Sequence, residues 1–263
     1  MNVPANLQAL LIDLDGVMYR GGTTLPGAGD LLPALAELGI QYTFVTNNST
    51  TTPEEVAARL QGMGVSTDPE HVITSAQATA QYLGRVAAPG TRVFSIGESG
   101  LSTALTEAGL AVVDDKEVEF VVVGLDRHVT YERLAVACMA LRAGAKFVAT
   151  NADPGLPVEG GWWPGAGSIV ALLVTASGVS PTVIGKPEPV LLEAALDRLG
   201  ISKANAAMLG DQIHSDVKAG KAAGVTTILV GTDRPTAEAE PTPDVWVPDL
   251  PSLIAALRES HSA

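Results

Sequence analysis

Short apolar runs alternate with amphipathic stretches along almost the whole chain. The runs are continuous in hydrophobicity, which is typical of strands buried on both faces of a parallel sheet. They occupy residues 9–12, 42–45, 182–184, 206–209 and 226–230. Helical patterns lie between them: 53–60 begins with a proline followed by two acids, and 187–199 is followed by a glycine. The alternation predicts an α/β fold with a doubly wound, Rossmann-like parallel sheet.

The middle of the chain repeats this alternation and predicts a second α/β unit. Apolar runs at 92–96, 120–123 and 146–149 indicate strands, and 99–108 and 130–143 have helical patterns. The polar motifs described below lie only outside this middle part. We therefore expect residues 1–78 and 182–263 to form a catalytic core into which residues 79–181 are inserted as an α/β cap. No change of composition marks the joins.

Composition and charge narrow the classes of protein that fit. The 263 residues are 46% hydrophobic, enough for one large or two modest buried cores. The net charge of −13 argues against a nucleic-acid binder, although a metal ion and one lysine can reverse the sign locally for a small anion. Cys138 is the only cysteine, which excludes an intrachain disulfide. No apolar run approaches the roughly 20 residues of a membrane span and no signal peptide is evident, so we expect a cytoplasmic protein without a membrane partner.

Polar residues directly follow four of the predicted strands. They are Asp13-Leu14-Asp15-Gly16, Thr46-Asn47-Asn48-Ser49, Gly185-Lys186-Pro187, and Gly210-Asp211 with Asp216 further on. In a doubly wound sheet, residues just beyond the carboxyl ends of the strands converge on one crevice. The sequence therefore predicts one site assembled from four distant segments.

The carboxylates of this predicted site suit a metal-assisted phosphoryl transfer. Asp13 and Asp15 are two positions apart, so in an extended segment their side chains share a face. With Asp211 they form a hard oxygen site of the kind that Mg²⁺ prefers. The cation would let one carboxylate attack an anionic phosphate, and carboxylate nucleophiles are an established route in phosphoryl transfer.

Three further residues can bind the phosphoryl oxygens. Thr46 offers a hydroxyl, Asn47 a backbone N–H, and Lys186 a cation where negative charge gathers. Each also has a plainer interpretation: Thr46 and Asn47 as a helix cap, Lys186 as a solvated charge. Likewise, the aspartates can serve as strand-end turn residues and helix caps. The phosphoryl-transfer interpretation is favoured because it accounts for all four segments together.

Motif by motif, these segments resemble the haloacid dehalogenase superfamily of phosphatases. The resemblance runs from Leu10 to near Val230, and an insertion between the second and third motifs is similar to the C2-capped, NagD-like branch. Segments within the insertion also look like that branch, namely Gly124-Leu125-Asp126-Arg127, Ala149-Thr150-Asn151-Ala152-Asp153 and Pro164-Gly165-Ala166-Gly167-Ser168. An acid at Asp15 is what phosphatases of the superfamily have and its dehalogenases lack.

The resemblance implies a role for each matching residue. Asp13 would be nucleophile and metal ligand, and Asp15 general acid and then base, with its carbonyl on the metal. The expected catalytic residues are Asp13, Asp15 and Lys186; the substrate-binding residues Thr46, Asn47, Asn48, Lys186, Asn151 and Asp153; and the magnesium ligands Asp13, Asp15, Asp211 and Asp216. The string Gln212-Ile213-His214-Ser215 departs from many relatives, so Asp216 is expected either on the metal or behind its ligands.

The expected activity is hydrolysis of small phosphomonoesters. Nucleoside monophosphates, glycerol phosphate, phosphoglycolate, sugar phosphates and pyridoxal phosphate are all compatible with the resemblance. A phosphotransferase or mutase on the same scaffold, a catalytically silent metabolite-binding protein, and more distantly a glycosyltransferase remain alternatives. A homodimer through the cap is an assembly that the pattern allows, and Trp162-Trp163 can pack in the cap, join copies or stack on substrate.

Overall fold

The computed structural model describes residues 3–158, 160–236 and 240–261 and divides into two compact units. The core unit contains Met1–Thr46, Pro53–Ile73 and Lys186–Ala263. The inserted unit contains Asn47–Thr52 and Thr74–Gly185. None of the helices in the described ranges is long and apolar enough to cross a membrane.

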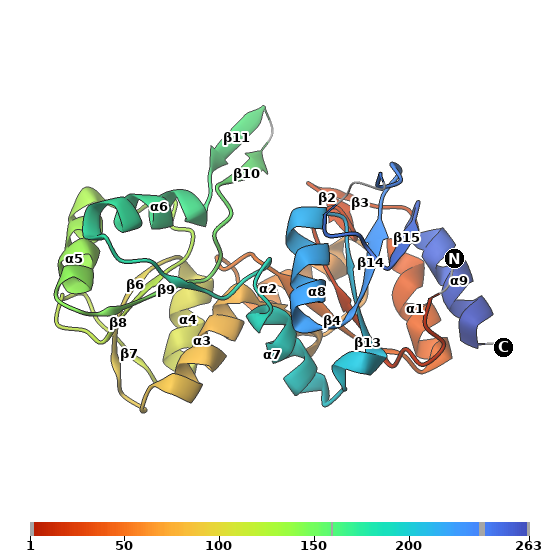
Figure 1. Cartoon of the computed structure of the whole chain (residues 1–263), viewed down its shortest axis with the longest axis horizontal. Coiled ribbons are helices and arrows are strands. Elements are labelled where there is room, and N and C mark those ends of the chain that lie inside the picture. The colour runs from red at the N-terminus through yellow and green to blue at the C-terminus, as the bar shows by residue number, and fades with distance from the viewer. Residues whose placement is uncertain (1–2, 159, 237–239, 262–263) are drawn as a thin grey trace. The chain divides into compact units, whose positions relative to one another are not determined.

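The core unit is built on a six-stranded sheet in the order β15-β14-β13-β1-β4-β5 (Figure 1). Its strands are β1 (Ala9–Ile12), β4 (Gln41–Thr46), β5 (Val72–Thr74), β13 (Ala206–Gly210), β14 (Thr226–Val230) and β15 (Val245–Val247). Strand β1 pairs in parallel with β13 and β4, in register Ile12 with Leu209 and with Phe44. The chain therefore leaves β1 first toward one edge of the sheet and later returns toward the other, which is the doubly wound order.

Helices cover both faces of this sheet (Figure 1). They are α1 (Ala28–Leu38), α2 (Pro53–Gly62), α7 (Val190–Leu199), α8 (Lys218–Ala223) and α9 (Leu250–His261). The apolar sides of α1, α2 and α9 join the inward side chains of the strands in one core, for example Leu31, Leu60 and Leu253 against Ile12 and Phe44. One small antiparallel pair, β2 (Tyr19–Arg20) with β3 (Thr23–Thr24), follows the first motif. The α/β class and the core strands are confirmed.

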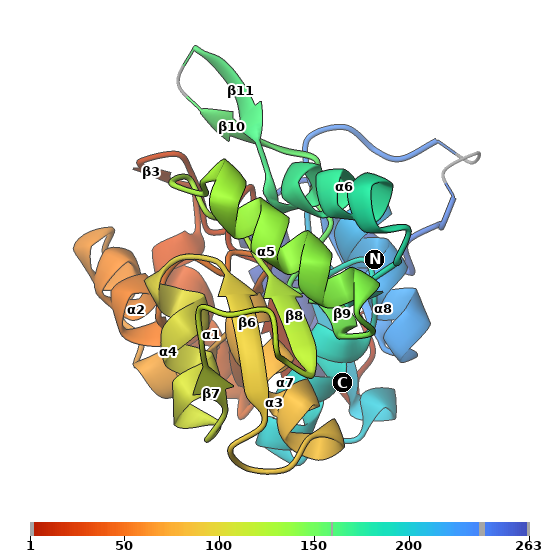
Figure 2. The ribbon, with the colours of Figure 1, turned by 90° about the vertical axis from the view of Figure 1, so that its left-hand side faces the viewer.

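The inserted unit has its own five-stranded sheet in the order β12-β9-β8-β6-β7 (Figure 2). Its strands are β6 (Arg92–Ile96), β7 (Ala111–Val112), β8 (Phe120–Val123), β9 (Lys146–Ala149) and β12 (Thr182–Val183), and a separate hairpin joins β10 (Gly155–Val158) to β11 (Gly161–Pro164). Helices α3 (Ser75–Val86) and α4 (Ser99–Glu107) cover one face, and α5 (Tyr131–Arg142) and α6 (Ala166–Ser177) the other. Phe94, Val121 and Phe147 pack with Leu141 and Leu173 in its core.

Two sequence expectations about the segments on either side of Lys186 are wrong. Residues 182–184 were expected in the core sheet, but Thr182–Val183 pairs in parallel with Val148 and Ala149 in the inserted unit. Helix α7 begins at Val190 instead of at 187, because residues 186–189 form a turn. The division into a catalytic core and a cap at 78/79 and 181/182 stays a prediction, because these units are defined by contacts and not by function.

Candidate active site

Asp13 and Asp211 lie where the chain order of the core sheet reverses. Asp13 directly follows β1, and Asp211 directly follows the neighbouring strand β13. The backbone N–H of Asp13 donates to the Leu209 carbonyl at 2.9 Å, which extends the ladder by one residue and fixes where the Asp13 side chain leaves the sheet. Ligands of open α/β sheets bind at this kind of switch point.

Lys186 binds two carboxylates of this group. Its ammonium donates to Asp13 Oδ1 at 2.6 Å and to Asp216 Oδ1 at 2.7 Å. The Lys186 side chain is only 3% exposed, so both ion pairs are shielded from water. Asp216 lies in a wide helical turn, Ile213–Val217, and its second oxygen accepts the Gln212 backbone N–H at 3.0 Å. Asp216 thus holds Lys186 against Asp13 and has both oxygens engaged.

The site has more negative than positive charge. Burial raises the pKa of Asp13, with Asp216 adding to the rise and Lys186 opposing it. Burial also raises the pKa of Asp211 to about 6, helped by Asp216. Burial works to lower the pKa of Lys186, but Asp13 and Asp216 hold it above its usual range. Three acids sharing one lysine is an arrangement that a further cation would stabilise.

The oxygen atoms of this cluster fit a hard divalent cation. One carboxylate oxygen each from Asp13, Asp211 and Asp216 lies within 4.8 Å of the others. Asp211 Oδ1 is buried and has no hydrogen-bond partner, which is costly unless a ligand completes its coordination. Asp216 already binds Lys186 and Gln212, so Asp13 and Asp211 are the carboxylates of this group that could most readily hold a cation, and the expected ligand set Asp13, Asp15, Asp211 and Asp216 stays a prediction.

The Asp15 side chain has neighbours, Tyr19 and Arg59, that were not predicted from the sequence. The Tyr19 hydroxyl bonds its carboxylate, and the Arg59 guanidinium stacks over the Tyr19 ring at 4.3 Å and donates to the Gly21 carbonyl at 2.8 Å. Loss of hydration raises the pKa of Asp15 against the lowering effects of Arg59, Lys186 and Tyr19. Tyr19 is four residues beyond Asp15, where the turn brings the chain back; for Arg59, on α2, the sequence contains no such signal.

The second motif is divided between the units. Thr46 is the last residue of β4 and is buried, and Asn47 begins the segment of the inserted unit. Asn47 Nδ2 donates to Asp153 Oδ2 at 3.0 Å, while Asn48 Oδ1 accepts the Thr50 N–H at 2.9 Å. The amide side chains of both asparagines are therefore held by their own unit.

The predicted cap residues lie at the carboxyl end of β9. Asn151 is buried and donates to the Asn47 carbonyl at 2.8 Å, close to the Asp153 bond to the same residue. Trp162 and Trp163 lie on β11 with 73% and 54% of their surfaces exposed. The structure thus brings Asn151 and Asp153 to Asn47 and leaves the two tryptophans on a hairpin surface.

Comparison with known proteins places this geometry in a family. The family described as haloacid dehalogenase-like hydrolase matches residues 10–111, and a HAD-hydrolase-like family matches residues 183–253. An acid sugar phosphatase of Staphylococcus aureus is 47% identical over 231 residues, covering 88% of this chain and 89% of the relative. The chain belongs to the haloacid dehalogenase-like hydrolases. This confirms the resemblance inferred from its four motifs.

Solved structures of such hydrolases superpose along nearly the whole chain. A p-nitrophenyl phosphatase from Archaeoglobus fulgidus has a TM-score of 0.89 and 36% identity, covering 95% of this chain and 99% of its own. A glycerol phosphate phosphatase from Mycobacterium tuberculosis, in complex with calcium, has a TM-score of 0.86 and 38% identity, covering 94% and 74%. The Rossmann-like core with an inserted α/β unit is therefore shared with HAD hydrolases of known structure.

Proposed function

We propose that this chain is a magnesium-dependent phosphomonoesterase that forms an aspartyl-phosphate on Asp13. One observation carries the proposal: the Lys186 ammonium lies 2.6 Å from Asp13 Oδ1, and the unpartnered Asp211 oxygen belongs to the same carboxylate cluster. A nucleophile, a fixed cation and carboxylate oxygens able to bind a hard metal ion are what attack on an anionic phosphate requires.

The general activity of the chain follows from its relatives. Proteins 35% to 47% identical to this chain are described as acid sugar, p-nitrophenyl and glycerol phosphate phosphatases. The chain is accordingly a HAD-type phosphatase, and its substrates are small phosphate esters. Sugar phosphate and glycerol phosphate become the first substrates to examine, with nucleoside monophosphate and phosphoglycolate next.

In the first half-reaction, an Asp13 oxygen attacks phosphorus and the bond from phosphorus to the ester oxygen breaks. Asp15 gives its proton to the departing oxygen, which leaves as an alcohol. The raised pKa of Asp15 favours the protonated form that this step needs. Thr46 and the backbone of Asn47 bind the phosphoryl oxygens, and Lys186 neutralises the charge that gathers on them.

In the second half-reaction, water attacks the phosphorus of the aspartyl-phosphate. Asp15, now ionised, takes the proton of that water, and Asp13 is released as a carboxylate together with inorganic phosphate. Asp13, the Asp15 carbonyl and Asp211 would hold Mg²⁺, which when bound supplies positive charge between the nucleophile and the phosphate. Asp216 keeps Lys186 in place through both steps.

A phosphomonoester panel with and without Mg²⁺ tests this proposal. Purified protein should release phosphate from at least one ester of the panel with Mg²⁺ and lose that activity with a chelator. Asp13→Asn should lower turnover by about a thousandfold or more while its circular dichroism spectrum stays unchanged. Retained steady-state hydrolysis by that variant would refute the nucleophile assignment.

The same assay separates the two alternative functions. A phosphotransferase or mutase would pass the phosphoryl group to an added alcohol in preference to water, so transferred phosphate would exceed free phosphate. A silent binding protein would show no magnesium-dependent turnover on any ester. The cytoplasmic location expected from the sequence stays a prediction.

A further inference from the structure

The segment Asn47–Thr52 is built into the carboxyl edge of the inserted sheet. Two of its neighbours follow strands of that sheet, namely the loop after β9 and the start of α4 after β6, and a third is the first turn of α3. Loops at this edge of an α/β sheet are where ligands commonly bind. Here they bind a segment of the chain itself, the one that continues the second motif.

Asn47 is held at both ends of its side chain. Its Nδ2 donates to Asp153 Oδ2 at 3.0 Å. Its Oδ1 faces Gly185, where a Cβ would lie only 2.5 Å away, so a residue larger than glycine would displace it. An aspartate can only accept at this position, and the amide orientation of Asn47 is thereby determined.

The peptide group after Asn47 is held as well. Its carbonyl accepts from Asn151 Nδ2 at 2.8 Å and from Ser75 Oγ at 2.7 Å. A trans peptide is planar, so two donors on the carbonyl fix this peptide plane. Because the side chain is held as well, both the Cβ and the carbonyl carbon of Asn47 are fixed, and its tetrahedral Cα then places the backbone nitrogen whose N–H is the proposed phosphoryl donor. Asn151 is itself oriented by the Asp153 N–H, which donates to its Oδ1 at 3.1 Å.

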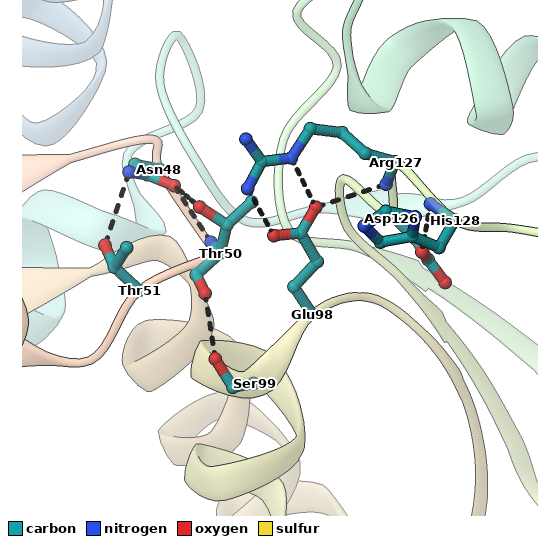
Figure 3. A network of polar contacts seen from close by, with 8 residues as sticks. All are labelled: Asn48, Thr50, Thr51, Glu98, Ser99, Asp126, Arg127 and His128. Atoms are coloured by element: carbon teal, nitrogen blue, oxygen red, sulfur yellow. Dashed lines mark hydrogen bonds and ion pairs between the residues drawn. The ribbon is translucent and has the colours of Figure 1, made fainter.

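The remainder of the segment is anchored by the network drawn in Figure 3. The Thr50 carbonyl accepts from the Gly100 N–H at 3.1 Å and from Ser99 Oγ at 3.4 Å. Glu98 directly precedes Ser99, the first residue of α4, and accepts two hydrogen bonds from the Arg127 side chain at 2.8 and 2.6 Å. The donors from Ser99 and Gly100 hold the segment at Thr50, while Asn151 and Asp153 hold its start.

We propose that Asn151 and Asp153 are positioning residues for phosphoryl binding, acting through Asn47 and not through contact with the ester's leaving group. The proposal rests on the proposed function, in which the backbone at Asn47 binds phosphoryl oxygens. It replaces the substrate contact that the sequence analysis expects of these two residues. Every substrate shares the phosphoryl group, so replacing either residue should lower kcat/KM by a similar factor for all substrates.

Steady-state kinetics of Asp153→Asn and Asn151→Ala on three esters test this role. The esters are p-nitrophenyl phosphate, glycerol phosphate and glucose 6-phosphate, whose leaving groups differ in shape and polarity. Loss of one partly buried hydrogen bond that orients Asn47 should lower kcat/KM by about ten- to a hundredfold. The factor should agree within about threefold across the three esters, since uniform loss is what a shared phosphoryl contact gives. Glu107→Gln, which removes an exposed carboxylate of α4, is the matched control and should change none of these values.

Inhibition by inorganic phosphate provides a readout without any leaving group. The inhibition constant of phosphate should rise in Asp153→Asn by about the factor found for the esters. Thermal unfolding of each variant ensures that the protein is folded at the assay temperature. Losses that differ more than tenfold between esters, with phosphate inhibition unchanged, would place Asn151 and Asp153 on the leaving group and overturn the proposal.

A double-mutant cycle tests the hydrogen bond directly. In the pair Asn47→Asp with Asp153→Asn, the amide and the carboxylate exchange places, so a donor and an acceptor still face each other. The double variant should recover about tenfold relative to the product of the two single losses. Strictly multiplicative losses would overturn the proposal. If the wild type hydrolyses none of the esters, the proposed function fails first and this inference with it.

Discussion

Gly16 determines how closely the first and fourth motifs approach each other. Its φ of 85° lies in the left-handed region, and a Cβ built on it would lie 2.0 Å from Asp211 Oδ2. Backbone conformation and space therefore both require glycine here. The absence of a side chain is what allows Asp211 to lie beside the turn that carries Asp13 and Asp15.

A pair of glycine substitutions separates these two requirements. Gly21 also has a left-handed φ, 60°, but a Cβ there meets nothing within 4 Å. Gly16→Ala should raise the Mg²⁺ concentration for half-maximal activity by about tenfold or more, because Asp211 must move away from its ligand position. Gly21→Ala has comparable backbone strain and should leave that concentration unchanged. Equal effects of the two substitutions would show that strain alone matters.

Glu98 links stability to pH. Its hydrogen bonds from the Arg127 side chain hold the pKa of this carboxyl below its usual range, against the raising effect of partial burial. A lowered folded-state pKa means that the stabilisation is complete above the ordinary carboxyl pKa of about 4.3 and is lost as the pH falls through the lowered value.

Thermal unfolding of Glu98→Gln measures this contribution. At pH 7 the variant should unfold at a temperature lower by about 2–4 °C, which corresponds to about 1 kcal/mol for a pair that is half exposed on the arginine side. The difference should narrow as the pH falls below about 4, because the wild-type carboxyl then becomes protonated too. Glu107→Gln should follow the wild type throughout. A difference that stays constant down to pH 3 would contradict the assignment.

Among the elements, helix α3 has the most complete start signal. Thr74 Oγ1 accepts the Gln77 N–H at 3.2 Å, and Gln77 Oε1 accepts the Thr74 N–H at 3.4 Å, which together form a capping box. The first residue of this helix, Ser75, binds the Asn47 carbonyl. The cap thus positions a residue that anchors the segment Asn47–Thr52, which we propose binds the phosphoryl group.

Thr74→Ala should lower the unfolding temperature by about 2–4 °C, which is the expected effect of losing an N-cap worth about 1 kcal/mol. Thr74→Ser keeps the hydroxyl and should retain most of the stability. Differential scanning calorimetry at pH 7 distinguishes the two. A serine variant as unstable as the alanine variant would show that the methyl packing of this buried threonine matters more than its cap.

The elements that the sequence predicted best are those with strong local signals. Continuous apolar runs identified the central strands β1, β13 and β14, and Pro53 with two acids marked the start of α2. The segment 182–184 has the same apolar character, but which sheet a three-residue run joins depends on its tertiary partners. Its partner is β9, so Lys186 reaches the site from a strand of the inserted sheet.

At the scale of the whole molecule, the sequence predicted those parts of the site that directly follow strands of the core sheet, because the ends of these strands converge. Asp13 and Asp211 follow adjacent strands, and the rule for doubly wound sheets brings them together. The partners of Asp15 and Asn47 were not predictable, because Arg59, Ser75 and Asp153 reach them only through packing between distant elements. The spacing of residues along the sequence contains no signal of such long-range contacts.

Association of two copies is the remaining prediction at this scale. We expect a homodimer through the inserted unit, and the exposed Trp162 and Trp163 supply an aromatic surface for it. Replacing both by alanine should raise the dimer dissociation constant by about a hundredfold or more, since buried tryptophans are frequent anchors of interfaces. Sedimentation velocity over a concentration series measures it. A wild type that stays monomeric at every concentration would exclude this assembly.

The chain passes between the two units four times, first between Thr46 and Asn47 and last between Gly185 and Lys186. These first and last passages are adjacent to residues proposed to bind the phosphate, which limits where the two parts of a chimera can be joined. A graft that exchanges only residues 74–185 would leave Asn47–Thr52 facing foreign loops without their matched donors. The segment Asn47–Thr52 should be transferred together with the foreign insert, so that the donors that hold it, and with them the proposed phosphate contacts, are kept.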